Sequence, residues 1–293
     1  MTHPPRAATP EGQAGLDALI SRPRQALIGT DFDGTLAPIV ADPRAARALP
    51  GAVPALQRLA PAVGTLAVIT GRPAADAVAY GGLDAVPGLI VLGHYGWERW
   101  QDGELTGPGS PPAVQAARQA LPGVLSQAGA PDGIWVEDKG HALAVHTRRT
   151  AAPEPALRQL RGPLEDLAAR LGLAAEPGRM VIELRPPGVD KGTALTGLAS
   201  ERAARSVLFC GDDLGDLPAF AAVRSLRADG IPGCAVASAS AESPQVAAEA
   251  DLVVAGPDGI VALLAAIAGQ LEPGQLEPGQ LEPGHQEPGH QEH

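Results

Sequence analysis

The chain has 293 residues, and its 45% apolar content is enough for one large core or two modest ones. A formal net charge of -11 argues against nucleic acid and anionic membrane surfaces as partners, because both would be repelled. The two cysteines, Cys210 and Cys234, lie in apolar or small-residue stretches, which indicates buried free thiols. The chain lacks the run of roughly 20 apolar residues that a membrane span needs and shows no signal-peptide pattern, so we expect a cytoplasmic protein.

Short apolar runs recur along the chain, with helical stretches between them. Runs this short and without alternation are typical of parallel strands that helices bury on both faces. The sequence therefore predicts an α/β fold built on a doubly wound parallel sheet. The expected strands are 26–28, 66–69, 89–92, 207–210, 235–237 and 252–254.

The middle of the chain has a different pattern, in which apolar and polar residues alternate. Alternation predicts a sheet with one solvent-facing side, and a Lys139-Gly140 turn would join its first two strands. We therefore predict an inserted α+β cap domain, with hinges near 97–103 and 186–190. In chain order its expected elements are a helix over 113–128, strands over 134–137 and 143–147, a helix over 154–171 and a strand over 179–185.

The two ends of the chain are expected to add little to the fold. From Leu271 onward a Leu-Glu-Pro-Gly-Gln repeat places a Pro-Gly pair every five residues, which excludes a helix or a paired strand. The predicted division is a flexible N-terminal segment over 1–24, a catalytic core over 25–102 and 187–268, the cap over 103–186 and a disordered tail over 269–293.

The most informative string is Asp31-Phe32-Asp33-Gly34-Thr35-Leu36, directly after the first predicted strand. Gly34 allows a tight turn that would bring both carboxylates to one reacting centre. A lone Asp-x-Asp also fits a solvated turn, whereas the longer string after a strand is far more specific.

A second acidic string, from Gly211 to Asp216, also follows an apolar strand. Asp212, Asp213 and Asp216 would repel one another strongly unless a cation lay among them, although an acidic helix N-cap is the simpler alternative. Oxygen ligands beside a phosphate site favour Mg²⁺ over zinc.

Two further strings supply groups that bind phosphate. Thr70-Gly71-Arg72 follows the second predicted strand, and Lys191 stands at the start of a helical run. A phosphoryl group in transfer needs positive charge and hydrogen-bond donors around its oxygens, and these residues provide both. Because strand ends meet at one edge of a parallel sheet, we expect the four strings to converge there.

These four strings resemble the motifs of the haloacid dehalogenase superfamily. In its detailed amino-acid sequence the chain is similar to the trehalose-6-phosphate phosphatases. The similar segments include Val136-Glu137-Asp138-Lys139, Ala144 to Arg148 and Val181 to Pro186. The resemblance covers roughly residues 25 to 265. It implies a Rossmann-like haloacid dehalogenase core with a cap, and hydrolysis of trehalose 6-phosphate as the last step of trehalose biosynthesis.

The resemblance also implies catalytic roles. Asp31 would be the nucleophile that forms an aspartyl-phosphate, and Asp33 would protonate the leaving sugar oxygen and then take a proton from the attacking water. Thr70 and Lys191 would bind the phosphoryl oxygens, with Lys191 also restraining Asp31.

A metal site is implied in the same way. Mg²⁺ would be held by the Asp31 carboxylate, the Asp33 backbone carbonyl and Asp212, and Asp213 and Asp216 would support the metal or its waters.

The resemblance also implies substrate-binding residues, namely polar residues of the cap that would contact the sugar, together with Gly71 and Arg72. On alternating strands Glu137 and Lys139 share a face, as do His146 and Arg148, although the solvent-facing side of a small sheet would explain such residues equally well. The implied substrate-binding residues are Gly71, Arg72, Glu137, Lys139, His146, Arg148 and Glu183.

Two features depart from the family pattern. The string Gly93-His94-Tyr95-Gly96-Trp97-Glu98 places Tyr95 where the family often has histidine, and Pro218 and Ala219 alter the usual acidic continuation after Asp216. We expect the core chemistry to be unaffected.

Three alternatives stay open at this point. The core strings do not specify the sugar, so the substrate could equally be sucrose phosphate or another sugar phosphate. A sugar-phosphate-binding regulator and a phosphomutase are the other classes, although Asp31 and Asp33 argue against a mere binder, since a carboxylate facing a phosphate dianion weakens binding. We expect a monomer whose partner is a small-molecule sugar phosphate.

Overall fold

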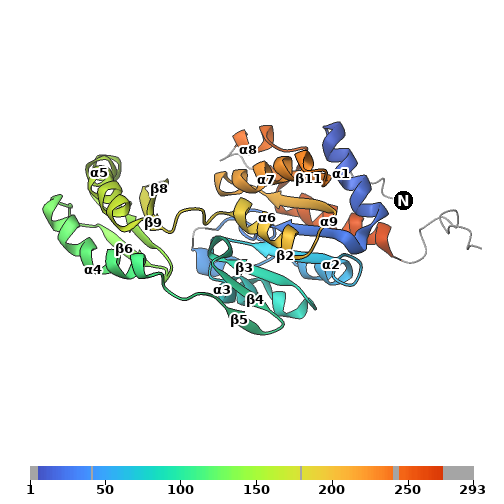
Figure 1. Cartoon of the computed structure of the whole chain (residues 1–293), viewed down its shortest axis with the longest axis horizontal. Helices are drawn as coiled ribbons and strands as arrows, with labels where there is room; N and C mark the ends of the chain where they lie inside the picture. Colours follow the sequence, from blue (N-terminus) through green and yellow to red (C-terminus); the bar gives the residue numbers. More distant parts are fainter. Residues whose placement is uncertain (1–5, 41, 179, 240–243, 273–293) are drawn as a thin grey trace, which may run out of the picture.

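The computed structural model describes residues 6–40, 42–178, 180–239 and 244–272, and shows two α/β bodies of different size (Figure 1). The larger body, here called the core, is built on an eight-stranded sheet in the order β12-β11-β10-β1-β2-β3-β4-β5. The first six strands in this order are parallel, whereas β4 is antiparallel to β3, and β5 is antiparallel to β4. The bounds are β1 (Ala26–Thr30), β2 (Thr65–Ile69), β3 (Ile90–Gly93), β4 (Glu98–Gln101), β5 (Glu104–Thr106), β10 (Ser206–Gly211), β11 (Gly233–Ser238) and β12 (Leu252–Val254).

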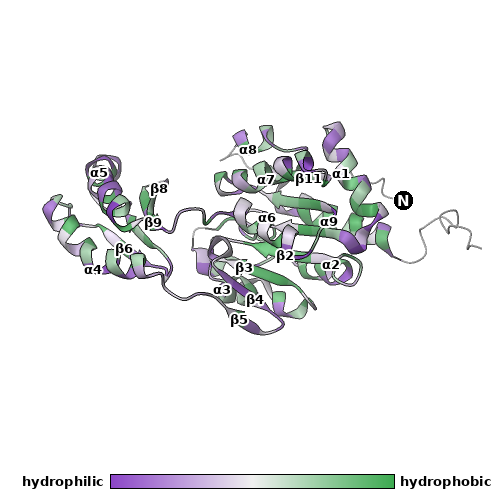
Figure 2. Cartoon of the chain, viewed as in Figure 1, coloured by the Kyte–Doolittle hydropathy of each residue, from purple (hydrophilic) through white to green (hydrophobic). Residues whose placement is uncertain are grey.

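Helices bury both faces of the core sheet, as the uninterrupted apolar runs predicted, and Figure 2 shows its central strands as hydrophobic. On one face pack α1 (Pro10–Ser21), α2 (Ala52–Leu59), α3 (Ala74–Gly81) and α9 (Gly256–Leu271). On the other pack α6 (Lys191–Glu201), α7 (Leu217–Ala228) and α8 (Pro244–Ala248). All six predicted strands are confirmed as β1, β2, β3, β10, β11 and β12, although β12, at the edge of the sheet, is only partly buried and exposes Val253.

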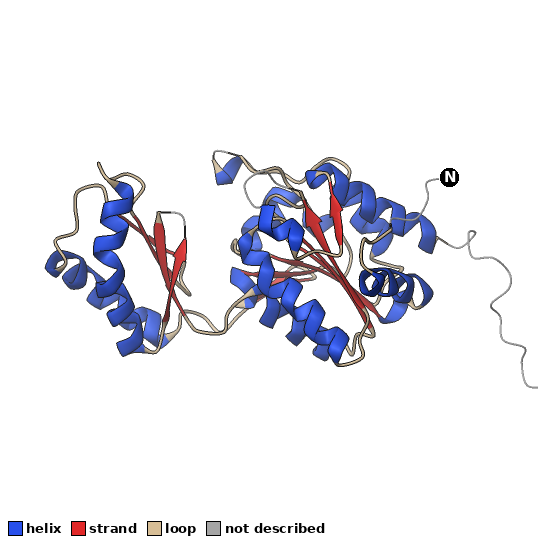
Figure 3. Cartoon of the chain, turned by 90° about the horizontal axis from the view of Figure 1, so that it is seen from above, coloured by secondary structure: helices blue, strands red, loops and turns tan. Residues whose placement is uncertain are grey.

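The smaller body, here called the cap, is inserted between β5 and α6. Its four-stranded antiparallel sheet has the order β6-β7-β9-β8 and carries two helices on one face, while the other face is turned toward the core (Figure 3). The bounds are α4 (Pro112–Gln127), β6 (Trp135–Asp138), β7 (Leu143–His146), α5 (Pro153–Leu171), β8 (Ala174–Gly178) and β9 (Val181–Arg185). The predicted helices and three alternating strands are confirmed; β8 was missed.

The boundaries of the core and the cap differ from the sequence expectation at several places. The region predicted as a flexible N-terminal segment contains α1, whose Leu16 and Leu19 are buried in the core and whose N-terminus is capped by the Thr9 hydroxyl. The predicted hinge at 97–103 is instead a β-hairpin of the core sheet, so the connection to the cap lies at 107–111.

The predicted tail begins too early, because α9 continues to Leu271; the repeat beyond residue 272 lies outside the described residues. None of the helices in the described ranges combines the length and the apolar character needed to cross a bilayer.

Candidate active site

The four strings singled out in the sequence meet at one edge of the core sheet. Thr30, the last residue of β1, is in register with Cys210 of β10 and Val68 of β2, so the segments that follow these three strands lie side by side. Lys191, at the start of α6, reaches into the same place, where its Nζ lies 2.8 Å from Asp31 Oδ1. The predicted convergence is confirmed.

The turn after Asp31 depends on Gly34. Its φ of +72° lies in the left-handed region, and a Cβ on this residue would stand 2.0 Å from Asp212 Oδ2. The buried hydroxyl of Ser238, at the end of β11, donates a hydrogen bond of 2.7 Å to the Gly34 carbonyl oxygen. Glycine is therefore required, and three strand ends fix the turn that carries Asp31 and Asp33.

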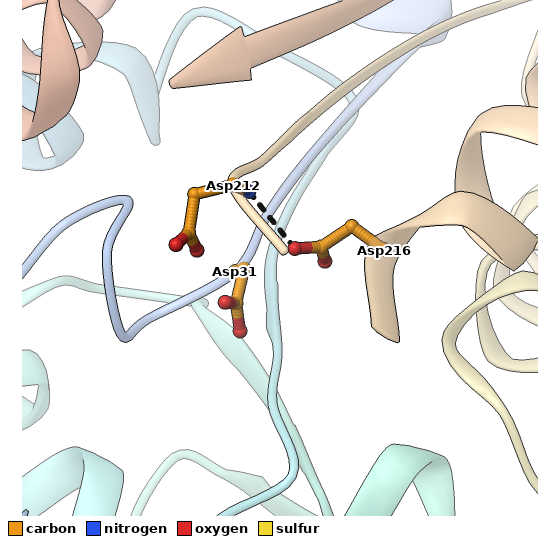
Figure 4. Close-up of side chains that lie close together, drawn as sticks. All are labelled: Asp31, Asp212 and Asp216. Atoms are coloured by element: carbon orange, nitrogen blue, oxygen red, sulfur yellow. Dashed lines mark hydrogen bonds between the residues drawn. The ribbon is translucent and has the colours of Figure 1, made fainter. Parts of the chain in front are cut away.

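Three buried carboxylates form the centre of the site. Asp31, Asp212 and Asp216 each offer an oxygen, and these oxygens all lie within 4.8 Å of one another (Figure 4). Two like charges at that separation repel by roughly 3 to 4 kcal/mol at an effective dielectric constant of about 20. Lys191 Nζ, which lies 2.7 Å from Asp216 Oδ1, offsets only part of this repulsion.

The charges of the cluster fit a divalent cation. Burial raises the pKa of Asp31 well above its usual range despite the opposing effect of Lys191. Burial, with Asp216 and Asp213, raises the pKa of Asp212 to about 7. Three carboxylates against one ammonium leave two negative charges, which a divalent ion on oxygen ligands would balance.

The acidic string places its three carboxylates in three different environments. Asp212 faces Asp31, as the sequence predicted for a metal ligand. Asp216 is buried, and its Oδ2 accepts hydrogen bonds from the backbone N–H groups of Asp212 (2.9 Å) and Asp213 (3.1 Å) while Oδ1 pairs with Lys191. The exposed Asp213 caps the 3-10 turn η5 (Leu214–Asp216), accepting from Gly215 N. Asp216 therefore orients both Lys191 and the loop of Asp212.

Lys191 remains a cation in this setting. Burial alone would lower the pKa of its ammonium, but the carboxylates of Asp216 and Asp31 outweigh burial and raise it well above the usual range. A permanently charged ammonium beside Asp31 suits the binding of a phosphoryl oxygen.

Asp33 and Arg72 form a bidentate pair at the edge of the site. Arg72 Nε and Nη2 each donate to an Asp33 carboxylate oxygen at 2.6 Å. Thr70 is buried, and its hydroxyl accepts from the Arg72 backbone N–H at 3.2 Å. The predicted acid-base residue is thus held by a residue predicted to bind substrate, a pairing that the sequence did not indicate.

A cavity of about 670 Å³ joins these groups to the cap. Asp31, Thr70 and Lys191 line one side, and Glu137 and Lys139 line the other. This volume falls within the roughly 300 to 1,000 Å³ typical of small-molecule sites. Sequence reasoning missed Ile39, Val40 and Tyr80 in the lining, and the exposure of Ile39 and Val40 became apparent only in the structure.

The cap residues predicted to bind sugar share the open face of the cap sheet with one exception. Glu137 of β6 is in register with Ala144 of β7, and Ala144 is in register with Glu183 of β9. The two glutamates therefore lie on the same face, which is the open one. Lys139 forms an ion pair with Glu183, and His146 Nε2 lies 3.1 Å from Glu137 Oε2. Within the described residues, Glu183 and His146 stand beside the cavity lining rather than in it.

Arg148 is the exception. It lies beyond the end of β7 and is exposed in the turn that follows, so it does not share a strand face with His146. The expected strand over 143–147 ends one residue early, and the alternation that placed these two residues together stops there.

Comparisons with known proteins agree with this geometry. The chain is 35% identical over 221 residues to the trehalose-phosphate phosphatase of Mycobacterium leprae, a match that covers 71% of this chain and 50% of the relative. The chain thus spans about half the length of the curated relatives it matches.

Solved structures share the fold. The C-terminal domain of C. albicans trehalose-6-phosphate phosphatase superposes with a TM-score of 0.70 at 22% identity, covering 92% of this chain and 99% of that domain. A haloacid dehalogenase-like hydrolase from Bacteroides thetaiotaomicron gives 0.56 at 17% identity, covering 83% and 99%. The fold is therefore a haloacid dehalogenase-like core with a cap. The sequence model of the trehalose-phosphatase family matches residues 29–258, so the chain belongs to that family.

Proposed function

We propose that this protein hydrolyses trehalose 6-phosphate to trehalose and inorganic phosphate through an aspartyl-phosphate on Asp31, with Mg²⁺ as cofactor. The observation that carries the proposal is the buried cluster of Asp31, Asp212, Asp216 and Lys191, of which Asp31 and Lys191 line a cavity that Glu137 and Lys139 of the cap also line. Membership of the trehalose-phosphatase family supports the choice of sugar over sucrose phosphate.

The chemistry proceeds in two steps. A carboxylate oxygen of Asp31 bonds to phosphorus as the phosphorus–oxygen bond to the sugar breaks, and Asp33 gives its proton to the departing sugar oxygen. Water then attacks phosphorus, Asp33 takes the proton, and the bond to Asp31 breaks. Lys191 stays protonated and donates to a phosphoryl oxygen throughout.

Arg72 links binding to this proton transfer. In the structure its guanidinium holds both carboxylate oxygens of Asp33. The substrate phosphate would compete for Arg72 and so release the Asp33 carboxyl toward the leaving sugar oxygen, while Thr70 and the Gly71 backbone contact the remaining phosphoryl oxygens.

Mg²⁺ would be held by Asp31, Asp212 and the Asp33 backbone carbonyl, with support from Asp213 and Asp216; the grouping of the Asp31, Asp212 and Asp216 carboxylates supports this proposal. When bound, Mg²⁺ supplies charge neutralisation for the phosphoryl group. The balance of two unpaired negative charges in the cluster supports a divalent ion.

The open face of the cap would bind the sugar through Glu137, Lys139, His146 and Glu183, whereas Arg148 lies in the turn beyond this face. Carboxylates, an ammonium and an imidazole together give the donors and acceptors that sugar hydroxyls require. Glu183→Ala should raise KM for trehalose 6-phosphate much more than KM for 4-nitrophenyl phosphate, and equal effects on both would contradict sugar contact.

The test is phosphate release from a panel of trehalose 6-phosphate, sucrose 6-phosphate, glucose 6-phosphate and 4-nitrophenyl phosphate, with EDTA or with Mg²⁺. We expect the highest kcat/KM for trehalose 6-phosphate and no release in EDTA. Asp31→Asn should abolish turnover with the fold intact, whereas Asp84→Asn on the exposed turn after α3 should not. Normal activity in Asp31→Asn would refute the nucleophile, and a clear preference for sucrose 6-phosphate would refute the substrate.

The proposal extends to a monomer in the cytoplasm. Cys210 and Cys234 are both buried free thiols, and burial raises the pKa of each. Free thiols are typical of proteins in a reducing compartment, which supports the cytoplasm. Light scattering after gel filtration and cell fractionation test these two points.

A further inference from the structure

The residue that departs from the family pattern, Tyr95, lines the cavity. It lines the wall together with Asp31, Thr70 and Lys191, and also with Lys139 of the cap.

The backbone of Tyr95 is fixed by the catalytic loop. His94, Tyr95 and Gly96 all have positive φ (50°, 60° and 95°), and left-handed conformations cost about 1 to 2 kcal/mol for a residue with a side chain. The Tyr95 N–H donates to the Thr70 carbonyl oxygen and the His94 N–H donates to that of Arg72, each at 2.8 Å. The loop that carries Thr70 and Arg72 therefore holds this strained turn and sets the direction of the Tyr95 side chain.

The Tyr95 ring is enclosed by the core on one side and the cap on another. A Cβ on Gly71 would lie 2.8 Å from Tyr95 Cζ and Oη, so the ring lies against the Gly71 backbone. The Arg185 guanidinium, at the end of β9, lies 4.9 Å from the ring centroid. The ring thus lies where the phosphate-binding loop meets the cap.

The hydroxyl of Tyr95 is neutral and lies among the charged groups of both halves of the site. Burial raises its pKa above the usual value; Glu183 adds to this effect, and Lys139 and Lys191 oppose it. Lys139 and Glu183 belong to the sugar-binding face, whereas Lys191 belongs to the phosphate site. A neutral phenol hydroxyl can both donate to and accept from a sugar hydroxyl.

We propose that Tyr95 is a specificity-determining residue that contacts the phosphorylated sugar ring through its hydroxyl, at the junction between the phosphate site and the cap. This inference rests on the proposed function only in that the substrate is a sugar phosphate. The Gly71 backbone and Arg185 keep the ring in place, so the hydroxyl is preorganised and costs little ordering entropy on binding.

The experiment compares Tyr95→Phe with the wild type on a sugar phosphate and on 4-nitrophenyl phosphate, which has no sugar. The variant keeps the ring between Gly71 and Arg185, and thermal unfolding verifies that it folds. We expect kcat/KM for trehalose 6-phosphate to fall about 10-fold, chiefly through KM, and kcat/KM for the aryl phosphate to stay within about twofold, since one sugar hydrogen bond is lost. Asp84→Asn, on the exposed turn after α3, is the control variant, and both of its kcat/KM values should stay within about twofold of the wild type.

An equal loss on both substrates, no loss on either, or the same selective loss in Asp84→Asn would overturn the inference. The proposed function is tested separately by the wild type, which must prefer trehalose 6-phosphate. If it prefers another sugar phosphate, that function fails, and the Tyr95 comparison is made with the preferred sugar phosphate. A wild type that hydrolyses no sugar phosphate at all overturns both.

Discussion

Removing the divalent metal should make the stability of this protein depend on pH through Asp212. The pKa of this buried carboxyl is raised to about 7 in the fold, against about 3.9 in an unfolded chain. Between these values the folded state binds more protons than the unfolded state, so the carboxyl costs stability as pH rises. From pH 5 to pH 8 the loss amounts to about 2 to 3 kcal/mol for Asp212 alone.

His94 and His141 act in the opposite direction over part of this range. Burial lowers the pKa of both imidazoles to about 4, so their contribution rises with pH up to about 6.5 and would hide that of Asp212. The difference between the wild type and Asp212→Asn cancels the histidines, because both proteins contain them.

The assay is urea unfolding of both proteins in EDTA at pH 5, 6, 7 and 8. We expect the free energy of unfolding of Asp212→Asn to gain about 2 to 3 kcal/mol relative to the wild type between pH 5 and pH 8. Mg²⁺ should raise the free energy of unfolding of the wild type more at pH 8 than at pH 5, and should raise that of the variant little. If the difference in the free energy of unfolding between the two proteins does not change with pH, the Asp212 carboxylate does not destabilise the metal-free fold. If Mg²⁺ stabilises both proteins equally, Asp212 does not bind the metal.

Three further outcomes follow from the same contacts. His141→Phe keeps an aromatic ring at the contact between core and cap, and should lessen the loss of stability between pH 6.5 and pH 4, measured by thermal unfolding; an unchanged acid transition would contradict a neutral buried imidazole. Gly34→Ala should abolish metal-dependent activity, because its Cβ would lie 2.0 Å from a carboxylate oxygen of the cluster, whereas Gly82→Ala, at φ +60° with nothing within 4 Å, should only lower stability by about 1 kcal/mol. Arg72→Gln should lower kcat/KM for trehalose 6-phosphate and 4-nitrophenyl phosphate alike, since both carry the phosphate; a loss confined to the sugar substrate would assign Arg72 to the sugar instead.

The amino-acid sequence by itself determined the core sheet and the position of the catalytic strings. Buried parallel strands must be apolar on both faces, so runs such as 66–69 and 207–210 are recognisable without any knowledge of their neighbours. The ends of parallel strands meet at one edge, which is why the convergence of Asp31, Thr70 and Asp212 could be predicted from their places after strands. α1 was predictable in principle, because Thr9-Pro10 is a helix start, but its Pro- and Ala-rich surroundings concealed it.

The tertiary structure alone decided how the polar groups pair across these segments. Arg72 reaches Asp33 across 39 residues and Lys191 reaches Asp216 across 25, and no local pattern distinguishes such partners from solvent-exposed charges. Likewise, the exposed capping position of Asp213 and the buried position of Asp216 follow from one tight turn at the end of β10. Tyr95 gains its place only because β3, the Gly71 loop and Arg185 of the cap come together in space. Local periodicity reports which side of an element is buried, whereas pairing depends on the distance between elements far apart in the chain, and only folding sets that distance.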